Sequence, residues 1–227
     1  MVASSDGALP ACWILAARLR EVTAIPALLD HLVYATPDLA TTVADFTRRT
    51  GIAPAPGGPH VGLGTRNYLV GLSGPYYLEI IGPDPAQPAP QHPRPFGIDR
   101  LTEPRTVTWA IRPPDLDVAL TAAHAAGHDP GPVLAMSRQR PDGSLLEWRL
   151  TLVAAAGVVP FLIDWGATEH PSAGLPSATL LAMSATTPNP DTTRGRLAAL
   201  GTDLTLGEGS ERLSFRIDTP EGVLDLS

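Results

Sequence analysis

Two side chains with acid–base and metal-binding capacity, His31 and Glu79, stand inside strongly apolar stretches of the chain, 31–35 and 76–81. A buried carboxylate is costly unless it is paired, ligated or facing water. Imidazole and carboxylate together can hold a divalent metal or transfer a proton. We therefore predict a site role for both residues. The alternatives are a core or capping histidine beside Asp30 and, for Glu79, a surface acid at a sheet edge.

His60 is the second candidate for proton transfer, with Glu79 as a possible general base. It stands in a glycine-rich segment, 57–67, which allows close backbone approach and the motion that a lid needs. A plain turn is the alternative. Arg66 and Asn67 follow at the start of a predicted strand, where Arg suits a carboxylate or phosphate of a ligand; a surface ion pair is the alternative for Arg66.

Four further residues are candidates for the same site. Arg138, Trp148 and Trp165 are predicted to contact a substrate, with a surface or structural role as the alternative. His170 follows Trp165 and is a candidate metal ligand. His92, His124 and His128 are interpreted as surface or linker positions.

The elements that must position these residues recur along the chain. A strand pattern, a proline-containing helix start and three further strand patterns occur in the same order three times. The helix starts are 36–39, 114–116 and 187–189, where Thr, Asp or Asn can cap free N–H groups. This predicts an α+β fold of three βαβββ modules; an α+β protein without a true repeat is the alternative. The predicted divisions are an N-terminal extension (1–27), module 1 (28–85), a proline-rich linker (86–105), module 2 (106–170), a short linker (171–177) and module 3 (178–227).

Composition excludes several function classes. The formal net charge is -7 and there is no basic run, so no nucleic-acid partner is expected. All sixteen basic residues are Arg, which excludes Schiff-base chemistry on Lys. The single Cys12 allows no intrachain disulfide, and the apolar run around it is too short to span a membrane. A cytoplasmic protein from a GC-rich bacterium is expected. No dinucleotide or phosphate-loop motif is complete, so no nucleotide cofactor is expected.

Three segments of module 1 carry a family resemblance. The stretch 30–39 is similar to an opening strand and helix start, 57–67 to a glycine-rich entry into the third strand, and 76–82 to the fourth strand. They resemble the glyoxalase-like domain of the vicinal-oxygen-chelate superfamily, which includes glyoxalases, extradiol dioxygenases and drug-binding resistance proteins. Segments 137–143 and 160–165 share the resemblance, which covers most of 29–227.

The resemblance implies that two modules pair to form an open cup, with metal ligands from the first and fourth strand of each. His31 and Glu79 occupy those positions in module 1. Counting from the helix start places Thr108 at the first-strand position of module 2, and Ile163 or, after a one-residue slip, Asp164 at its fourth-strand position. A second histidine ligand would then have to come from outside these strands, from His60 or His170. Module 3 offers Ala182 and Asp225.

The function that the resemblance implies is that of a metal-dependent lyase, isomerase or dioxygenase acting on a small molecule with vicinal oxygens. Zn²⁺, Fe²⁺, Mn²⁺ or Ni²⁺ would suit His31, Glu79 and His170. The rival is a metal-free protein of the same fold that binds a drug or metabolite. A third hypothesis is a structural or regulatory protein whose cup is an interface. The odd number of modules also makes a homodimer possible.

Overall fold

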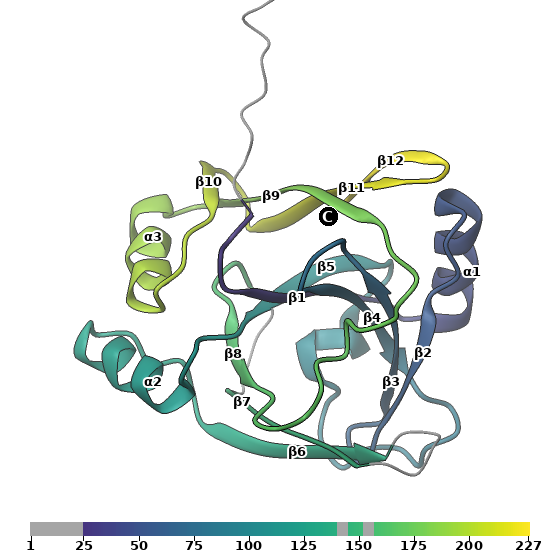
Figure 1. Cartoon of the computed structure of the whole chain (residues 1–227), viewed down its shortest axis with the longest axis horizontal. Coiled ribbons are helices and arrows are strands. Elements are labelled where there is room, and N and C mark those ends of the chain that lie inside the picture. The colour runs from purple at the N-terminus through teal and green to yellow at the C-terminus, as the bar shows by residue number, and fades with distance from the viewer. Residues whose placement is uncertain (1–24, 140–144, 152–156) are drawn as a thin grey trace, which may run out of the picture.

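The order β-α-β-β-β occurs three times in the part of the chain that the computed structural model describes, residues 25–139, 145–151 and 157–227. This confirms the predicted α+β fold built from repeated units (Figure 1). Cys12 and the apolar run around it lie outside the described residues. No described helix has the length and apolar character needed to cross a membrane. The elements are β1 (Leu29–Ala35), α1 (Leu39–Thr50), β2 (Ala55–His60), β3 (Thr65–Gly71), β4 (Tyr77–Pro83), η3 (Pro95–Arg100), β5 (Arg105–Ile111), α2 (Leu116–Ala125), β6 (Val133–Gln139), β7 (Leu145–Thr151), β8 (Phe161–Asp164), β9 (Thr179–Thr187), α3 (Pro190–Ala199), β10 (Thr205–Glu208), β11 (Arg212–Thr219) and β12 (Gly222–Leu226).

The helices begin where the proline-containing signals predict. The Asp38 carboxylate accepts a hydrogen bond from the Thr41 backbone N–H (3.0 Å) at the start of α1, and Asp115 caps α2 in the same way. Gly51 ends α1 in the left-handed conformation (φ 71°), which glycine adopts without strain. α3 begins with Pro190 after Asn189, whose side chain makes no capping bond. These helix boundaries fix where the following strands start.

Modules 1 and 2 share one eight-stranded sheet, in the order β2-β3-β4-β1-β5-β8-β7-β6. The sheet is strongly curved (Figure 1), and β1 and β5 are its two central strands. In modules 1 and 2 the first strand pairs parallel with the fourth, and β1 pairs antiparallel with β5. His31 pairs with Ala110 and Val33 with Thr108, a local twofold relation that makes Thr108 the counterpart of His31.

Module 3 repeats the order of elements but not their pairing. Its sheet has the order β10-β9-β11-β12, so β9 pairs with β10 and β11 and not with the last strand. It crosses over one face of the large sheet (Figure 1), where Met183 and Phe215 share an apolar core with Leu32 and Trp109. Module 3 therefore covers the outer face of the cup within the same chain.

β2 departs from the sequence expectation. The sequence predicts a short strand near residues 52–54 followed by a glycine-rich loop, but the strand is Ala55–His60 and contains that glycine-rich segment. β2 is an edge strand whose pairing with β3 shifts between Pro56 and Gly58. Edge strands and bulges tolerate the Pro and Gly residues that disfavour a central strand. His60 consequently stands on a strand end and not in a free loop.

Candidate functional site

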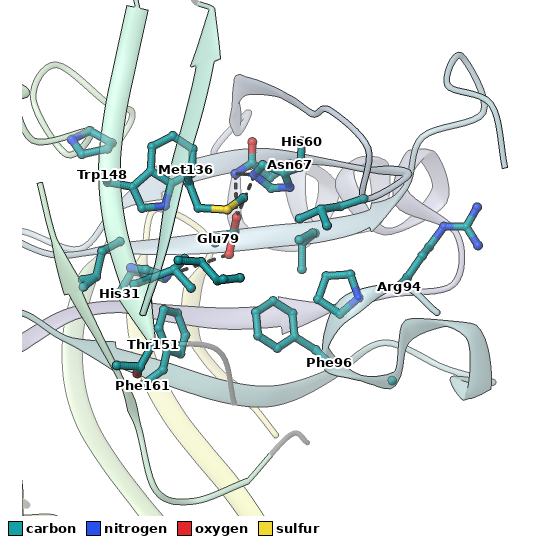
Figure 2. A pocket seen from close by; sticks show the side chains of 18 of the residues that line it. His31, His60, Asn67, Glu79, Arg94, Phe96, Met136, Trp148, Thr151 and Phe161 are labelled. Carbon is teal, nitrogen blue, oxygen red and sulfur yellow. Dashed lines mark hydrogen bonds and ion pairs between the residues drawn. The ribbon is translucent and has the colours of Figure 1, made fainter. Parts of the chain in front are cut away.

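The inner face of the large sheet encloses a cavity of about 690 Å³. Its walls are mostly apolar and aromatic, and one group of polar side chains lies where β1, β3 and β4 are next to one another (Figure 2). The principal wall residues are Tyr77, Phe96, Met136, Trp148, Phe161 and Trp165. A pocket that is apolar with a few convergent polar groups is the usual form of a small-molecule site.

His31 and Glu79 lie next to each other on the wall of this cavity that β1 and β4 form (Figure 2). The Nε2 atom of His31 lies 3.9 Å from Oε2 of Glu79, and the two residues are 4% and 8% exposed. β1 and β4 are adjacent and parallel, so alternate residues of both strands point to the cavity. The His31 ring stacks on Tyr77, with 4.8 Å between ring centroids. The structure thus brings together the two residues that the alternation pattern singled out.

Asn67 and His60 approach the Glu79 carboxylate from β3 and β2. The Asn67 amide donates to Oε1 of Glu79 at 2.6 Å, and Nε2 of His60 lies 3.8 Å from the same oxygen. Nδ1 of His60 is 3.0 Å from Thr65 Oγ1. Glu79 is therefore held through one oxygen while the other faces His31. The sequence predicts that Asn67 contacts a substrate; in the structure its amide orients the Glu79 carboxylate.

Gly57 leaves the space that the Asn67 side chain occupies. A Cβ atom at position 57 would lie 2.0 Å from Oδ1 of Asn67, closer than packed atoms can approach. Gly57→Ala is therefore expected to displace the Asn67 amide and destabilise the fold by about 1–3 kcal/mol, the usual cost of overpacking.

Gly195→Ala is the matched control for this substitution, measured by urea unfolding of both variants. Gly195 lies on exposed α3 with nothing within 4 Å of an added Cβ. The free energy of unfolding of Gly195→Ala should rise by about 0.5–1 kcal/mol, because Ala stabilises a helix relative to Gly. Equal and small effects of the two substitutions would contradict the tight packing of Asn67.

Asp30 is the residue of this site that sequence reasoning missed, having treated it only as a neighbour of His31. It is fully buried and accepts hydrogen bonds from Nδ1 of His31 (2.7 Å), Nε2 of His170 (3.0 Å) and Nε1 of Trp165 (3.2 Å). Burial alone would raise the pKa of this carboxyl, but the hydrogen bonds from His170 and His31 outweigh burial and hold the pKa well below its ordinary value. The sequence signal was an Asp directly before the candidate His.

Two predicted site residues, His170 and Arg66, lie outside the group around Glu79. His170 is turned to Asp30 through Nε2 and to Ser172 through Nδ1, so it is not brought to Glu79. Arg66 lies on the strand face opposite to Asn67, with Nη1 3.9 Å from Asp84. Arg138 lies on β6, and its side chain is outside the described residues. Of the other predicted residues, Trp148 and Trp165 do line the cavity, with ring centroids 5.4 Å apart.

The donor set of the cup does not fit a complete metal centre. Thr108 and Ile163 occupy the positions where the resemblance implies metal ligands from module 2. Ile163 lines the cavity, whereas the Asp164 carboxylate accepts a hydrogen bond from Arg149 at 2.7 Å. Among residues 25–139, 145–151 and 157–227, no three His, Cys, Asp or Glu side chains converge in a way that could hold a metal ion. Catalytic zinc sites take about three protein ligands. Of the four strand positions that the resemblance implies, two carry suitable metal donors, those of His31 and Glu79.

The proline-rich linker forms one wall of the cavity, where the sequence predicted a spacer. Phe96 adopts the left-handed conformation (φ 59°), uncommon for a bulky side chain, and packs against Phe161 with 6.1 Å between ring centroids. Arg94 holds this segment in place by donating through Nε to the Gly64 carbonyl (2.9 Å). Such outliers persist where surrounding structure fixes them, often at ligand clamps.

Two βαβββ modules joined through β1 and β5 into one curved sheet around a cavity define the vicinal-oxygen-chelate class. The family model of the glyoxalase-like domain matches residues 29–201, and the chain belongs to this family. No curated protein matches the chain by sequence.

Solved structures are similar to the chain at low sequence identity. A hypothetical protein from Staphylococcus aureus is similar with a TM-score of 0.59 and 12% identity, over 87% of this chain and 84% of that one. The methylmalonyl-CoA epimerase from Mycobacterium tuberculosis has a TM-score of 0.40 and 16% identity, over 66% and 95% of the two chains. A mutant 4-hydroxymandelate synthase from Streptomyces coelicolor has a TM-score of 0.46 and 16% identity, over 89% and 62%. At 12% identity the likeness to the Staphylococcus aureus protein concerns the fold alone.

Proposed function

We propose that the chain is an enzyme of the isomerase or lyase type that moves a proton on a small molecule held in the cup. The observation that carries this proposal is the facing pair of buried groups, His31 Nε2 and Glu79 Oε2, 3.9 Å apart on the cavity floor. Proton abstraction beside a carbonyl needs a positioned base and a positioned acid within reach of one substrate. A substrate with neighbouring oxygens would present such a C–H bond to the pair.

The pair is suited to exchange a single proton. Nδ1 of His31 donates to Asp30, so Nε2 turns an acceptor toward the cavity, and an ionised Glu79 is also an acceptor. Two acceptors at this distance favour a donor group of the ligand between them. The group that takes a proton from a substrate carbon becomes the acid that returns a proton to the substrate, and the apolar walls keep water from competing.

Incorporation of deuterium from solvent tests this function even while the product is unidentified. The protein would be incubated in D₂O with a panel of α-hydroxy and α-keto carbonyl compounds, and exchange at the carbon beside the carbonyl would be followed by NMR. We expect catalysed exchange for at least one compound. The surface variant His124→Gln should exchange it at the wild-type rate. Absence of exchange for a compound that demonstrably binds would overturn the proposal.

A metal-free binding protein is the second candidate, because aromatic walls dominate the cavity. Trp148 and Trp165 lie side by side on one wall, and Phe96 and Phe161 on another. Such walls bind flat apolar molecules without any chemistry. Binding that quenches tryptophan fluorescence, with no exchange in D₂O across the panel, would favour this candidate over the enzyme.

Metal content separates the proton-transfer enzyme from a metal-dependent lyase, isomerase or dioxygenase. Because Thr108 and Ile163 replace two ligands, we expect protein purified without chelator to contain clearly substoichiometric Zn, Fe, Mn and Ni by elemental analysis, with His31→Ala no different. A full equivalent of metal that His31→Ala loses would contradict this expectation and favour the metal-dependent enzyme.

A further inference from the structure

We propose that Asp30 is a positioning residue that holds two histidines, His31 and His170, in opposite tautomers. It would thereby present the Nε2 lone pair of His31 to the cavity. The tautomer assignment stands on hydrogen-bond geometry, and its consequence for catalysis rests on the proposed function.

A β-bulge places Asp30 beside the ring that it holds. The pairing of β1 with β5 shifts between Leu29 and His31, so Asp30 is the extra residue of the strand. A bulge breaks the strict alternation of side chains and re-aims them, which lets neighbouring residues meet. Oδ1 of Asp30 thus reaches Nδ1 of the following His31 at 2.7 Å, although consecutive residues of a regular strand point to opposite faces.

The other donors to Asp30 come from the end of module 2. Nε2 of His170 lies 3.0 Å from Oδ2, and the indole N–H of Trp165 donates to the same oxygen at 3.2 Å. The ring of His170 also meets the edge of Trp165, with 5.9 Å between centroids. The half-buried Arg112 places Nε 3.7 Å from Oδ2 and completes the groups around the carboxylate. Asp30 therefore joins β1 to the segment after β8.

The hydrogen bonds assign the tautomers. An ionised carboxylate only accepts, so the proton in each bond to Asp30 belongs to the imidazole. His31 then carries its proton on Nδ1. His170 carries its proton on Nε2, which agrees with the Ser172 backbone N–H donating to Nδ1 of His170 (3.3 Å). The nitrogen that a histidine turns to its ligand is set by the bond that its other nitrogen makes.

Nitrogen NMR on protein with ¹⁵N-labelled histidine tests the assignment, at a pH where neutral imidazole dominates. In the wild-type protein we expect His31 to show a protonated Nδ1 and a bare Nε2, and His170 the reverse. Spectra of His31→Gln and His170→Gln identify the two signals. A bare Nδ1 on His31, or an imidazolium with both nitrogens protonated, would overturn the proposal. The wild-type spectrum decides this by itself, whether or not any Asp30 variant folds.

Asp30→Asn tests the cause. The Asn amide can donate as well as accept, so the Nδ1–H form of His31 is no longer imposed, and its signals should move toward the Nε2–H form. His170→Gln leaves Asp30 intact and should leave the His31 signals in place. Unchanged His31 signals in Asp30→Asn would contradict the positioning role.

The two proposals can fail separately. A protonated Nδ1 on His31 together with no deuterium exchange would leave the role of Asp30 standing and reject the enzyme. Deuterium exchange that persists at the wild-type rate in Asp30→Asn, with His31 in the Nε2–H form, would leave the enzyme standing and reject the catalytic consequence of positioning.

Discussion

Glu79→Gln should lower the rate of deuterium exchange on the substrate by about 10²- to 10⁴-fold, the usual contribution of a positioned general acid or base. Gln has nearly the same shape, and its amide oxygen can still accept the hydrogen bond that Asn67 donates to Oε1. The amide nitrogen takes the place of Oε2, and it cannot accept a proton from His31 or from a C–H bond of the substrate. The rate should fall through kcat, while the affinity for the ligand changes little, because the apolar walls are untouched.

Glu147→Gln is the matched control for Glu79→Gln. Glu147 lies on β7 of the same sheet but is exposed and does not line the cup. This variant should exchange deuterium at the wild-type rate. Retained exchange in Glu79→Gln, with ligand affinity unchanged, would remove Glu79 from the chemistry and leave His60 as the group to test next.

The central strands of the cup could be predicted from the sequence because the β propensity of their residues and the alternation of their side chains both indicate a strand. His31 and Glu79 stand among β-prone apolar residues in regular alternation, so the face that each occupies follows from counting. The same counting made Thr108 the counterpart of His31 in module 2, and the twofold pairing of β1 with β5 agrees. Counting also gave Ile163 or, after a one-residue shift in alignment, Asp164 as the ligand position of the fourth strand. Ile163 lines the cavity, which is the alignment without a shift.

The rest of the site could not be predicted because it depends on irregular backbone and on distant contacts. The bulge at Asp30 arises from the pairing of β1 with β5, and its other donors are 135 and 140 residues away in sequence. β2 contains Pro and Gly, whose local preference is for a turn, and it forms a strand because β3 offers it an edge. The linker forms a wall of the cavity through Phe96, and no local sequence pattern predicts the left-handed backbone conformation of this residue.

Asp30→Ala should destabilise the protein at neutral pH by about 3–5 kcal/mol, the usual cost of breaking a buried charged network by removing one partner. The substitution leaves the N–H groups of His31, His170 and Trp165 without their acceptor in an apolar interior. The folded state holds the pKa of Asp30 below the ordinary value of 3.8. The carboxylate therefore stabilises the fold above about pH 4, and this contribution disappears as the pH falls through the folded-state pKa.

Urea unfolding of wild type and Asp30→Ala at a series of pH values measures this contribution. The difference in free energy of unfolding should be largest near neutral pH and shrink as the pH falls below about 4. Asp225→Ala is the control, because Asp225 pairs with Arg216 on the exposed surface of module 3. It should cost about 0–1 kcal/mol. A difference for Asp30→Ala that does not shrink in acid would mean that the carboxyl stabilises the fold by its shape and not by its charge.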